Sequence, residues 1–438
     1  MTLLENQTPK TNKKRIIVYT AAAIFIAVCS FFVGFATFQL TMDKEMRSLM
    51  RLKQEIQSKY YYEVDDTAFY KVLFDAVNRE ILDDYSQYLT AEEYAAMQQS
   101  ATGAQEGVGI TFLTENGKGE KQLLISSVIG NSPAEESGLT AGEFIIGYGT
   151  AAENITPCVD FDVFKAFVDG VTSGTQFYVN VLGFSGQTRI VALTKRAYVE
   201  SYVYYKTSTS AYGFTGQDAS KLIERGQPLS SLPSDAAYIR LTRFNGAAAE
   251  EFDTAMGRFR ADGKKHLVLD LRDNGGGYLD VMQKICKYFC KSATVNDPVA
   301  AIADFGEYKE YYKAAGNVYT QYFDADSRVM VIADKNSASA SECLLGVMID
   351  YGATAYGDIC LVERDGEART YGKGIMQTTY PLFGFTGEAV KLTTAQICWP
   401  KGNCIHGRGI LPQDGTKTVK EAPENDGELT AAIQALFS

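Results

Sequence analysis

Hydrophobic and polar residues alternate with different periods in successive parts of this 438-residue chain. The first part is a run without charge from Ile16 to Leu40, twenty-five residues long. As a helix this run would extend about 37 Å, which exceeds the roughly 30 Å hydrocarbon core of a bilayer. The run therefore predicts one transmembrane helix over residues 16–40.

Basic residues before the run indicate its orientation. They are Lys10, Lys13, Lys14 and Arg15. Their position favours a cytoplasmic N-terminus, residues 1–15, with the rest of the chain outside the cytoplasm, although basic residues also follow the run. A cleaved signal peptide is an alternative, but the run is long for one and lacks a clean A-x-A site. Lipidation at Cys29 is a further alternative, and Val28 stands where a small residue is wanted.

The next part, residues 41–103, has the period of helices. The stretch "TAFYKVLFDAVNREILDDY" places apolar residues at i, i+3 and i+4, and "TAEEY" predicts a helix start with Thr90 as N-cap and Glu93 closing a capping box. We expect this region to be helical throughout.

Between residues 104 and 197 the pattern changes to short strands separated by glycine-containing turns. "GVGITFL" and "KQLLISSVI" alternate as strands do, "DFDVFKAFVDG" predicts a helix, and "TQFYVNVLG" and "TRIVALTKR" predict a hairpin across "FSGQ". These residues predict a small, separate β domain.

Residues 198–425 alternate apolar strands with amphipathic helices. "AAYIRLTRF", "KHLVLDLR" and "RVMVIAD" predict strands, and helices are expected after each of them. This alternation predicts an α/β core around a mostly parallel sheet. Residues 426–438 remain as a C-terminal tail.

Charge and cysteine content narrow the possible functions. The formal net charge is -11 and no basic stripe is present, which argues against a nucleic-acid partner. The eight cysteines include no C-x-x-C pair, so we expect no metal site. Cys398 and Cys404 could bridge a short loop in an oxidising compartment, and free thiols are an equally good interpretation.

The stretch "NSASASE", residues 336–342, combines a structural and a chemical pattern. Ser339 and Glu342 fit a capping box at the start of an apolar helix. A serine at that place also lies near free N–H groups that can stabilise a tetrahedral oxyanion. If a serine here is a nucleophile, it needs a base, and neither of the two histidines, His266 and His406, belongs to a motif that pairs it with a serine.

A lysine is the alternative base. Lys373 lies between two glycines in "YGKGIMQ", and Gln377 four residues later could hold its amine. Burial can lower a lysine pKa by roughly 3 to 5 units, enough to populate the neutral amine. The glycine-rich "DLRDNGGGYLD" follows a predicted buried strand but lacks a nucleotide-binding motif. Backbone N–H groups at Gly276 or Gly277 could instead complete an oxyanion hole. Taken alone, each of these segments also fits an ordinary cap or turn.

The order of these segments resembles the carboxyl-terminal processing (tail-specific) serine proteases from about residue 55 to 415. The most specific matches are "SASASE" and "GKG" followed by glutamine, and residues 104–197 resemble the circularly permuted PDZ domain of such enzymes. The resemblance implies an α/β protease core of ClpP/crotonase-like βαβ units with an inserted PDZ-like β domain. It assigns the nucleophile to Ser339, the general base to Lys373 and the orienting amide to Gln377. Oxyanion donors would be Ala340 with Gly276 or Gly277, and Asp350 would be structural.

The same resemblance implies a function and a location. Together with the transmembrane helix predicted over residues 16–40, it implies a single-pass membrane serine endopeptidase of a bacterial cell envelope. The catalytic part would be extracytoplasmic, or periplasmic if there are two membranes. Its substrates would be unstructured protein C-termini, captured by Gly107, Val108, Gly109 and Ile110 of the PDZ-like domain, and no cofactor is expected. A homo-oligomer or an adaptor partner stays open. The alternative function is a catalytically silent, membrane-tethered PDZ adaptor on a protease fold.

This chain departs from the family pattern in a few places. The gap of 34 positions between Ser339 and Lys373 is longer than is typical, so the segment "CLVERDGEART" is expected to form a larger loop near the site. "NGGG" stands where a proline-containing turn is more usual, and Glu143 stands where aspartate is commoner. None of these changes removes a catalytic group.

Overall fold

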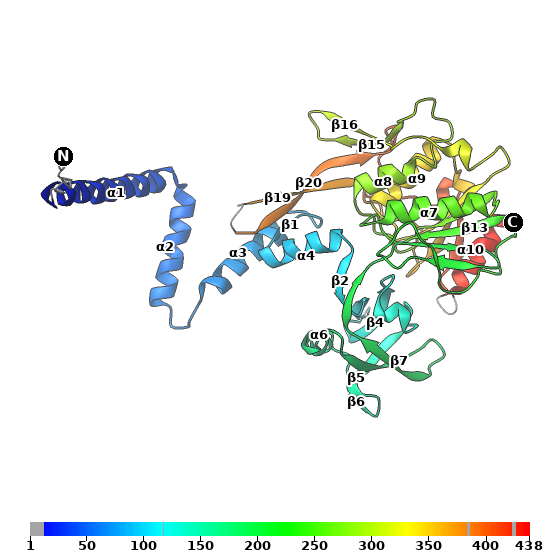
Figure 1. Cartoon of the computed structure of the whole chain (residues 1–438), viewed down its shortest axis with the longest axis horizontal. Coiled ribbons are helices and arrows are strands. Elements are labelled where there is room, and N and C mark those ends of the chain that lie inside the picture. The colour runs from blue at the N-terminus through cyan, green and yellow to red at the C-terminus, as the bar shows by residue number, and fades with distance from the viewer. Residues whose placement is uncertain (1–12, 117, 383–385, 423–425) are drawn as a thin grey trace, which may run out of the picture. The chain divides into compact units, whose positions relative to one another are not determined.

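The computed structural model describes residues 13–116, 118–382, 386–422 and 426–438 (Figure 1). They fall into two compact units, Met1–Ile81 and Leu82–Ser438. Of the N-terminal segment 1–15 that we expect in the cytoplasm, residues 1–12 lie outside the described residues.

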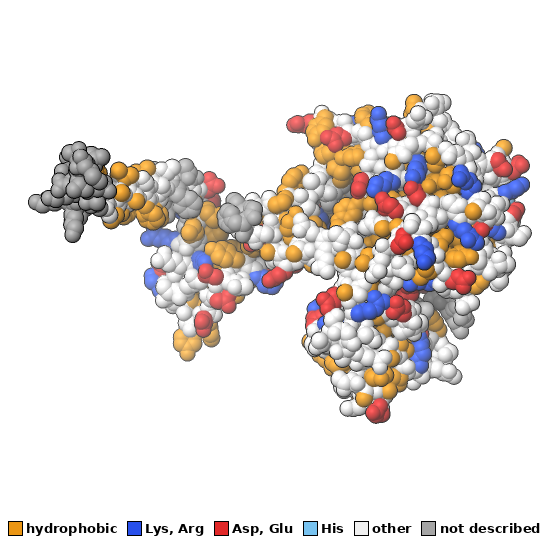
Figure 2. Space-filling model, viewed as in Figure 1, with side chains coloured by type: hydrophobic (Ala, Val, Ile, Leu, Met, Phe, Trp, Pro, Cys, Tyr) orange, Lys and Arg blue, Asp and Glu red, His pale blue; other side chains and the backbone are white. Residues whose placement is uncertain are grey.

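The described part of the smaller unit is helical. Its helices are α1 (Lys13–Thr41), α2 (Lys44–Lys59) and α3 (Asp66–Glu80). Within α1, the twenty residues Val18–Thr37 are long and apolar enough to cross a membrane, and a signal sequence would meet the same criterion. Hydrophobic side chains are exposed along this helix (Figure 2).

The prediction of helices throughout residues 41–103 is wrong at one point. Residues Gln87–Leu89 form strand β1, which precedes helix α4 (Ala91–Ala101). Three residues are too few to show a period of two in the sequence, and the strand exists because it pairs with a strand 300 positions later and buries Leu89. The predicted capping box is present, since Thr90 Oγ1 accepts the Glu93 N–H and Glu93 accepts the Thr90 N–H.

The larger unit is built on a mostly parallel sheet. In spatial order its strands are β12 (Ile223–Glu224), β11 (Ala211–Gly213), β10 (Val203–Lys206), β13 (Ala236–Leu241), β14 (His266–Asp270), β17 (Val329–Asp334), β18 (Ile359–Glu363) and β21 (Lys417–Lys420). The strands from β13 to β21 are parallel and the others antiparallel, as the strand–helix alternation predicts.

Successive residues of the central strands face opposite sides of this sheet. On β17, Val331 and Ala333 pack in the larger core with helices α7 (Ala248–Ala261), α8 (Leu279–Cys286) and α9 (Ala340–Asp350). Met330 and Ile332 pack in a second core on the other face. Because both faces are covered, the strands read as continuous apolar runs.

The last residues of the chain belong to that second core, which corrects their interpretation as a tail. Helix α10 (Gly427–Phe437) buries Leu429, Ile433 and Leu436 against the sheet. The buried Arg272 guanidinium donates to Asp270, Asp426 and Glu428, so it ties the end of β14 to the start of this helix. A short amphipathic segment looks like a tail in sequence because the sheet face that receives it is formed by distant residues.

A second sheet carries the segment after Lys373. Its strands are β1, β20 (Ala389–Cys398), β15 (Val299–Asp304), β16 (Lys309–Lys313) and β19 (Ile375–Pro381), which pairs with β20. The longer segment before Lys373 forms a tight turn rather than a large loop: Arg364 and Glu367 bridge, and the Arg364 side chain bonds Asp334 and Glu428. Short 3-10 turns complete these regions, η1 (Tyr319–Gln321), η2 (Tyr356–Asp358) and η3 (Pro412–Asp414).

Residues 104–199 form a β-rich part with a core of its own. Its elements are β2 (Ala104–Gly107), β3 (Ile110–Glu115), β4 (Lys121–Val128), α5 (Pro133–Glu136), β5 (Phe144–Ala151), β6 (Asn154–Pro157), α6 (Phe161–Gly170), β7 (Gln176–Leu182), β8 (Thr188–Thr194) and β9 (Arg196–Val199). The sheet runs β3-β4-β5-β7-β8, β6 pairs with β5, and β2 pairs with β9. Its buried side chains, among them Ile125, Phe164 and Val179, form a separate hydrophobic cluster.

Candidate functional site

The three serines of "SASAS" have different surroundings. Ser337 Oγ donates to the Leu271 carbonyl at 2.8 Å, and Ser341 Oγ donates to the Asn274 carbonyl at 2.8 Å. Both outer serines are buried and fasten their segment to the glycine-rich loop after β14. Ser339 is half-buried at the N-cap of α9. The outer hydroxyls are therefore structural, and the middle serine is the candidate for chemistry.

Ser339 also has a strained backbone. Its φ is 57° and its ψ is -115°, a region that residues with a Cβ rarely adopt. Such a conformation costs roughly 1 to 3 kcal/mol and persists only where the surrounding structure enforces it. This backbone conformation places the Ser339 side chain at the turn between β17 and α9.

The glycine-rich loop lies against this turn. A Cβ on Gly276 would come within 2.8 Å of both the Ser339 Cβ and the Ala340 nitrogen, so only glycine fits. The Gly276 N–H is already bonded to Asn274 Oδ1 at 3.0 Å. Gly277 lies opposite Phe244 in a parallel β-bridge. The Phe244 N–H donates to the Gly276 carbonyl and the Tyr278 N–H donates to the Phe244 carbonyl, so Gly277 itself makes neither bond. Among the described residues, the Gly277 N–H is left without an acceptor, as is the first helical N–H, that of Ala340.

Glu342 joins the serine turn to the lysine segment. Its carboxylate is 1 % exposed. Oε2 accepts the backbone N–H of Ser339 at 3.1 Å and that of Lys373 at 2.9 Å. Oε1 accepts the Thr370 hydroxyl at 2.6 Å and the Gly372 N–H at 2.8 Å. Since one oxygen touches both nitrogens, Ser339 and Lys373 are held side by side. Burial raises the Glu342 pKa, against the effect of these hydrogen bonds.

Lys373 is half-buried. Within the described part of the chain, no side-chain hydrogen bond or ion pair holds Nζ. Burial lowers the Lys373 pKa, the charge of Lys391 lowers it further, and Asp83 and Glu342 oppose this. Nζ lies 5.1 Å from the centre of the Tyr85 ring. Among the described residues, no hydrogen bond joins the Ser339 hydroxyl to Lys373 Nζ, and hydrogen bonds between catalytic groups are often long in structures without a bound substrate.

The glycines beside Lys373 allow close packing of the segment 404–409. A Cβ on Gly372 would lie 2.9 Å from the Gly409 nitrogen, and one on Gly374 would lie 2.9 Å from the His406 nitrogen. The Gly407 N–H donates to the Gly372 carbonyl at 2.8 Å. His406, which the sequence ties to no motif, therefore lies beside the lysine segment, whereas the His266 ring accepts the Arg328 N–H at the start of β14.

Gln377 occurs in β19 at a point where the pairing with β20 shifts register. Its Nε2 is buried and has no hydrogen-bond partner among the described residues. Such a group costs about 1–3 kcal/mol when it stays unpaired. Asp350 has a structural contact, because its Oδ2 accepts the Lys401 N–H at 2.7 Å.

The predicted peptide-binding residues form the turn that leads into β3. The carbonyl of Val108 accepts the Ala134 N–H, and that of Gly109 accepts the Ile129 N–H, both at 2.9 Å. β3 is the end strand of its sheet in the described residues, so one of its edges is unpaired. Beside it, Phe112 contacts Phe161 and Phe164 of α6, with ring centres 6.0 and 5.7 Å apart.

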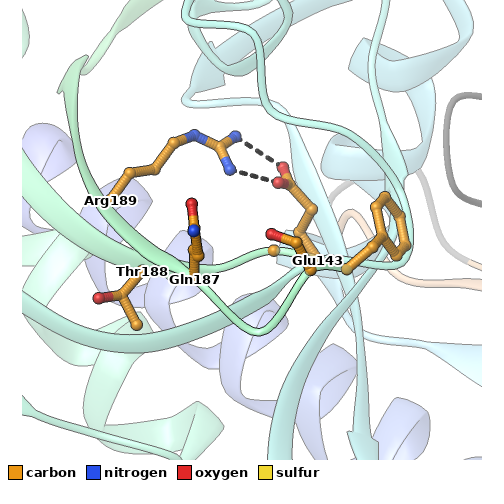
Figure 3. A pocket seen from close by; sticks show the side chains of 7 residues that line it. Glu143, Gln187, Thr188 and Arg189 are labelled. Atoms are coloured by element: carbon orange, nitrogen blue, oxygen red, sulfur yellow. Dashed lines mark hydrogen bonds and ion pairs between the residues drawn. The ribbon is translucent and has the colours of Figure 1, made fainter.

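A hollow of about 280 Å³ lies elsewhere on this β-rich part (Figure 3). It is lined by Glu143, Gly183, Phe184, Ser185, Gln187, Thr188 and Arg189. Arg189 grips the buried Glu143 carboxylate with both terminal nitrogens, Nη2 at 2.9 Å from Oε2 (Figure 3). The ion pair fastens the β7–β8 hairpin to the start of β5, and the hollow contains none of the predicted catalytic or peptide-binding residues.

The described residues contain neither a metal-ligand cluster nor a disulfide. No group of three or more His, Cys, Asp or Glu side chains there could hold a metal ion. All eight cysteines are free, including Cys398 and Cys404.

Comparisons with known proteins agree on one family. The sequence model of peptidase family S41 matches residues 235–414. A relative from Staphylococcus saprophyticus named "Probable CtpA-like serine protease" is 26% identical over 403 residues, which is 91% of this chain and 70% of the relative. The "C-terminal processing peptidase, chloroplastic" of Tetradesmus obliquus is 27% identical over 343 residues, 77% of this chain and 67% of the relative.

The fold is similar to that of solved proteases. The photosystem II D1 C-terminal processing protease superposes with a TM-score of 0.50 at 22% identity, over 88% of this chain and 89% of the other. An S41 protease from Bacteroides fragilis gives a TM-score of 0.51 at 15% identity, over 86% and 91% of the two chains. At these identities the likeness concerns the fold.

Proposed function

Because this chain belongs to peptidase family S41 and is a serine-type peptidase, we propose that Ser339 is its nucleophile and Lys373 its general base. The observation that carries the proposal is the Glu342 carboxylate oxygen that accepts the backbone N–H groups of both residues. The strained backbone of Ser339 and the unpaired, half-buried Lys373 amine support the same roles.

The proposed cycle follows from these positions. Neutral Lys373 takes the proton of Ser339 Oγ as that oxygen attacks the carbonyl carbon of the scissile peptide bond. The oxyanion is stabilised by the N–H groups of Ala340 and Gly277, and Gln377 orients the lysine amine. The leaving amine takes the proton from Lys373, which leaves an acyl ester on Ser339. Lys373 then removes a proton from water as the water oxygen attacks the ester carbon. It gives that proton to Ser339 Oγ as the ester bond breaks, which releases the new carboxyl terminus and restores the free serine and the neutral amine.

A fluorophosphonate probe tests this assignment, because it labels only an activated serine. The full-length protein in detergent should be labelled, and Ser339→Ala and Lys373→Ala should not. Absence of labelling in folded wild-type protein would favour the silent adaptor, and retained labelling of Ser339→Ala would exclude Ser339 as the nucleophile.

We also propose that residues 104–197 capture the C-terminal tail of a substrate as PDZ domains do. The unpaired edge of β3, the turn Gly107–Ile110 and the Phe112–Phe164 contact with α6 support this role. A free carboxylate is required in this mode. A peptide should therefore bind, and its amidated form should bind much more weakly; equal binding of the two would contradict the proposal.

The helix α1 supports a place for the enzyme in the bacterial envelope. We propose that Val18–Thr37 is a retained single-pass anchor with residues 42–438 outside the cytoplasm. The mature protein should resist carbonate extraction from membranes and keep its N-terminus by mass spectrometry. Loss of residues up to about the end of α1 would identify a signal peptide instead.

A further inference from the structure

Tyr85 belongs to a segment far from the catalytic loops in sequence, yet it lies over Lys373. Its ring centre is 5.1 Å from Lys373 Nζ. His406 is also near this ring, with the two ring centres 6.4 Å apart at an interplanar angle of 63°. Tyr85 thus lies close to both the lysine amine and the segment that packs against Gly372 and Gly374.

The position of Tyr85 is fixed by β1 and β20. Gln87, Tyr88 and Leu89 pair with Lys391, Val390 and Ala389. Ser86 Oγ accepts the Thr393 N–H at 2.8 Å. β20 also pairs with β19, which begins two residues after Lys373. The segment 82–89 and the lysine are consequently held by one sheet.

We propose that Tyr85 is a positioning residue for the general base, in which its ring forms one wall of the Lys373 site and keeps water from the amine. This inference rests on the proposed role of Lys373. A wall of this kind destabilises the ammonium more than the neutral amine, because the charged form loses more hydration. The π face of the ring attracts the ammonium and acts in the opposite direction, by a smaller amount at a half-buried site.

Other groups around the amine act in known directions. Lys391 on β20 disfavours the ammonium, whereas Asp83 and Glu342 favour it. Burial is the largest contribution to the lowered Lys373 pKa. The Tyr85 hydroxyl bonds to Tyr371, and this bond is the main cause that raises the Tyr85 pKa to about 12, so the phenol stays neutral over the working range. The hydroxyl therefore adds no charge beside Lys373, and the ring acts on the amine through packing and through its π face.

The test is the pH profile of fluorophosphonate labelling of the full-length protein in detergent. The labelling rate of the wild type should fall on the acid side as Lys373 becomes protonated. In Tyr85→Ala water reaches the amine, so the Lys373 pKa should rise and this acid limb should move to higher pH by about one unit. At pH values below the limb the variant should label about tenfold more slowly than the wild type, and at pH values above it the two rates should be nearly equal. Tyr85→Phe keeps the ring and should keep the limb of the wild type.

Tyr88→Ala is the matched control. Tyr88 lies in β1, three residues after Tyr85, and its hydroxyl donates to Glu388 Oε1 at 2.7 Å. Its loss should lower stability without moving the limb. If Tyr85→Ala does not fold, Tyr85→Gln keeps a larger side chain than alanine, replaces the ring by a hydrated amide and should move the limb upward.

Several outcomes would overturn the inference. They are an unmoved limb in Tyr85→Ala or Tyr85→Gln, a rate lowered equally at every pH, and an equal shift in Tyr88→Ala. In each of these cases labelling of the wild type would still support Ser339 and Lys373. Failure of the wild type to label at any pH would instead contradict the proposed function itself.

Discussion

Glu342 Oε2 accepts the backbone N–H of Lys373 at 2.9 Å, although the two residues are 31 positions apart. Through the N–H of Ser339 the same oxygen also holds the serine turn. The backbones of the proposed nucleophile and the proposed base are therefore held together by a buried carboxylate that takes no part in the proposed proton transfers. The longer spacing of Ser339 and Lys373 in the sequence does not alter this arrangement, because the extra residues form the turn at Arg364.

Glu342→Gln should impair catalysis more than substrate binding. One carboxylate oxygen becomes an NH₂ group that faces N–H donors, which leaves buried groups unpaired at a cost of about 1–3 kcal/mol. We expect kcat to fall roughly tenfold to a hundredfold with little change in KM. Thr370→Val removes one donor to Oε1 and leaves both Oε2 bonds, so its effect should be smaller. Equal effects of the two variants in a peptidase assay would argue against the role of Oε2.

Substitution of each serine should separate structure from chemistry. Ser341→Ala loses a buried hydrogen bond, and its free energy of unfolding should fall by about 1–2 kcal/mol while labelling persists. Ser339→Ala and Ser339→Gly should both lose labelling. Because glycine tolerates a φ of 57°, the glycine variant should be more stable than the alanine variant by about 1 kcal/mol. Equal thermal stability of these two variants would contradict the backbone strain.

Lys391 should influence the pH dependence of the enzyme. Its positive charge disfavours the Lys373 ammonium and so lowers the Lys373 pKa. In Lys391→Gln this pKa rises, so the acid limb of kcat/KM should move to higher pH by roughly 0.3 to 1 unit at low salt. Lys391→Arg keeps the charge and should keep the limb. Added salt should reduce the difference between the glutamine variant and the wild type.

Glu251 should make stability depend on pH. This carboxyl is buried, and burial raises its pKa to about 8, while Oε2 accepts the N–H groups of Tyr202 and Val203. The folded state therefore binds a proton that the unfolded state has released, and stability falls as pH rises from about 4.5 to about 8.

Glu251→Gln stays neutral and keeps an acceptor oxygen. Its free energy of unfolding should decline less over this range, with a relative gain at pH 8 of roughly 1 to 3 kcal/mol. Denaturant unfolding of both proteins at pH 5 and pH 8 measures the difference. Parallel changes in the two proteins would show that Glu251 is ionised in the folded state.

Local patterns predict the elements of the larger sheet well. The strands β13, β14 and β17 and the helices between them follow from apolar runs and amphipathic periods, because those patterns are properties of neighbouring residues. Local patterns do not predict strand β1 or the packed helix α10, for the opposite reason. Leu89 pairs with Ala389, and Leu429 packs in one cluster with Val268 and Met330. These partners are distant in the sequence, and a short segment carries no period that reveals them.

Glu342 and Tyr85 show the same limit at the site. Glu342 is visible in the sequence as part of a capping box, which accounts for its bond to Ser339 but not for those to Thr370, Gly372 and Lys373. Tyr85 carries no signal in its own segment.

By itself, the sequence determined the kinds of chemistry available to this protein: a serine at a helix start, a lysine between glycines, glycine-rich turns and one long apolar helix. Only the tertiary structure decided which serine hydroxyl holds no neighbouring carbonyl, which glycine N–H has no acceptor among the described residues, and which side chains surround the lysine amine. The physical reason is that reactivity depends on burial and on hydrogen bonds between segments, and these exist only once the distant segments have packed together.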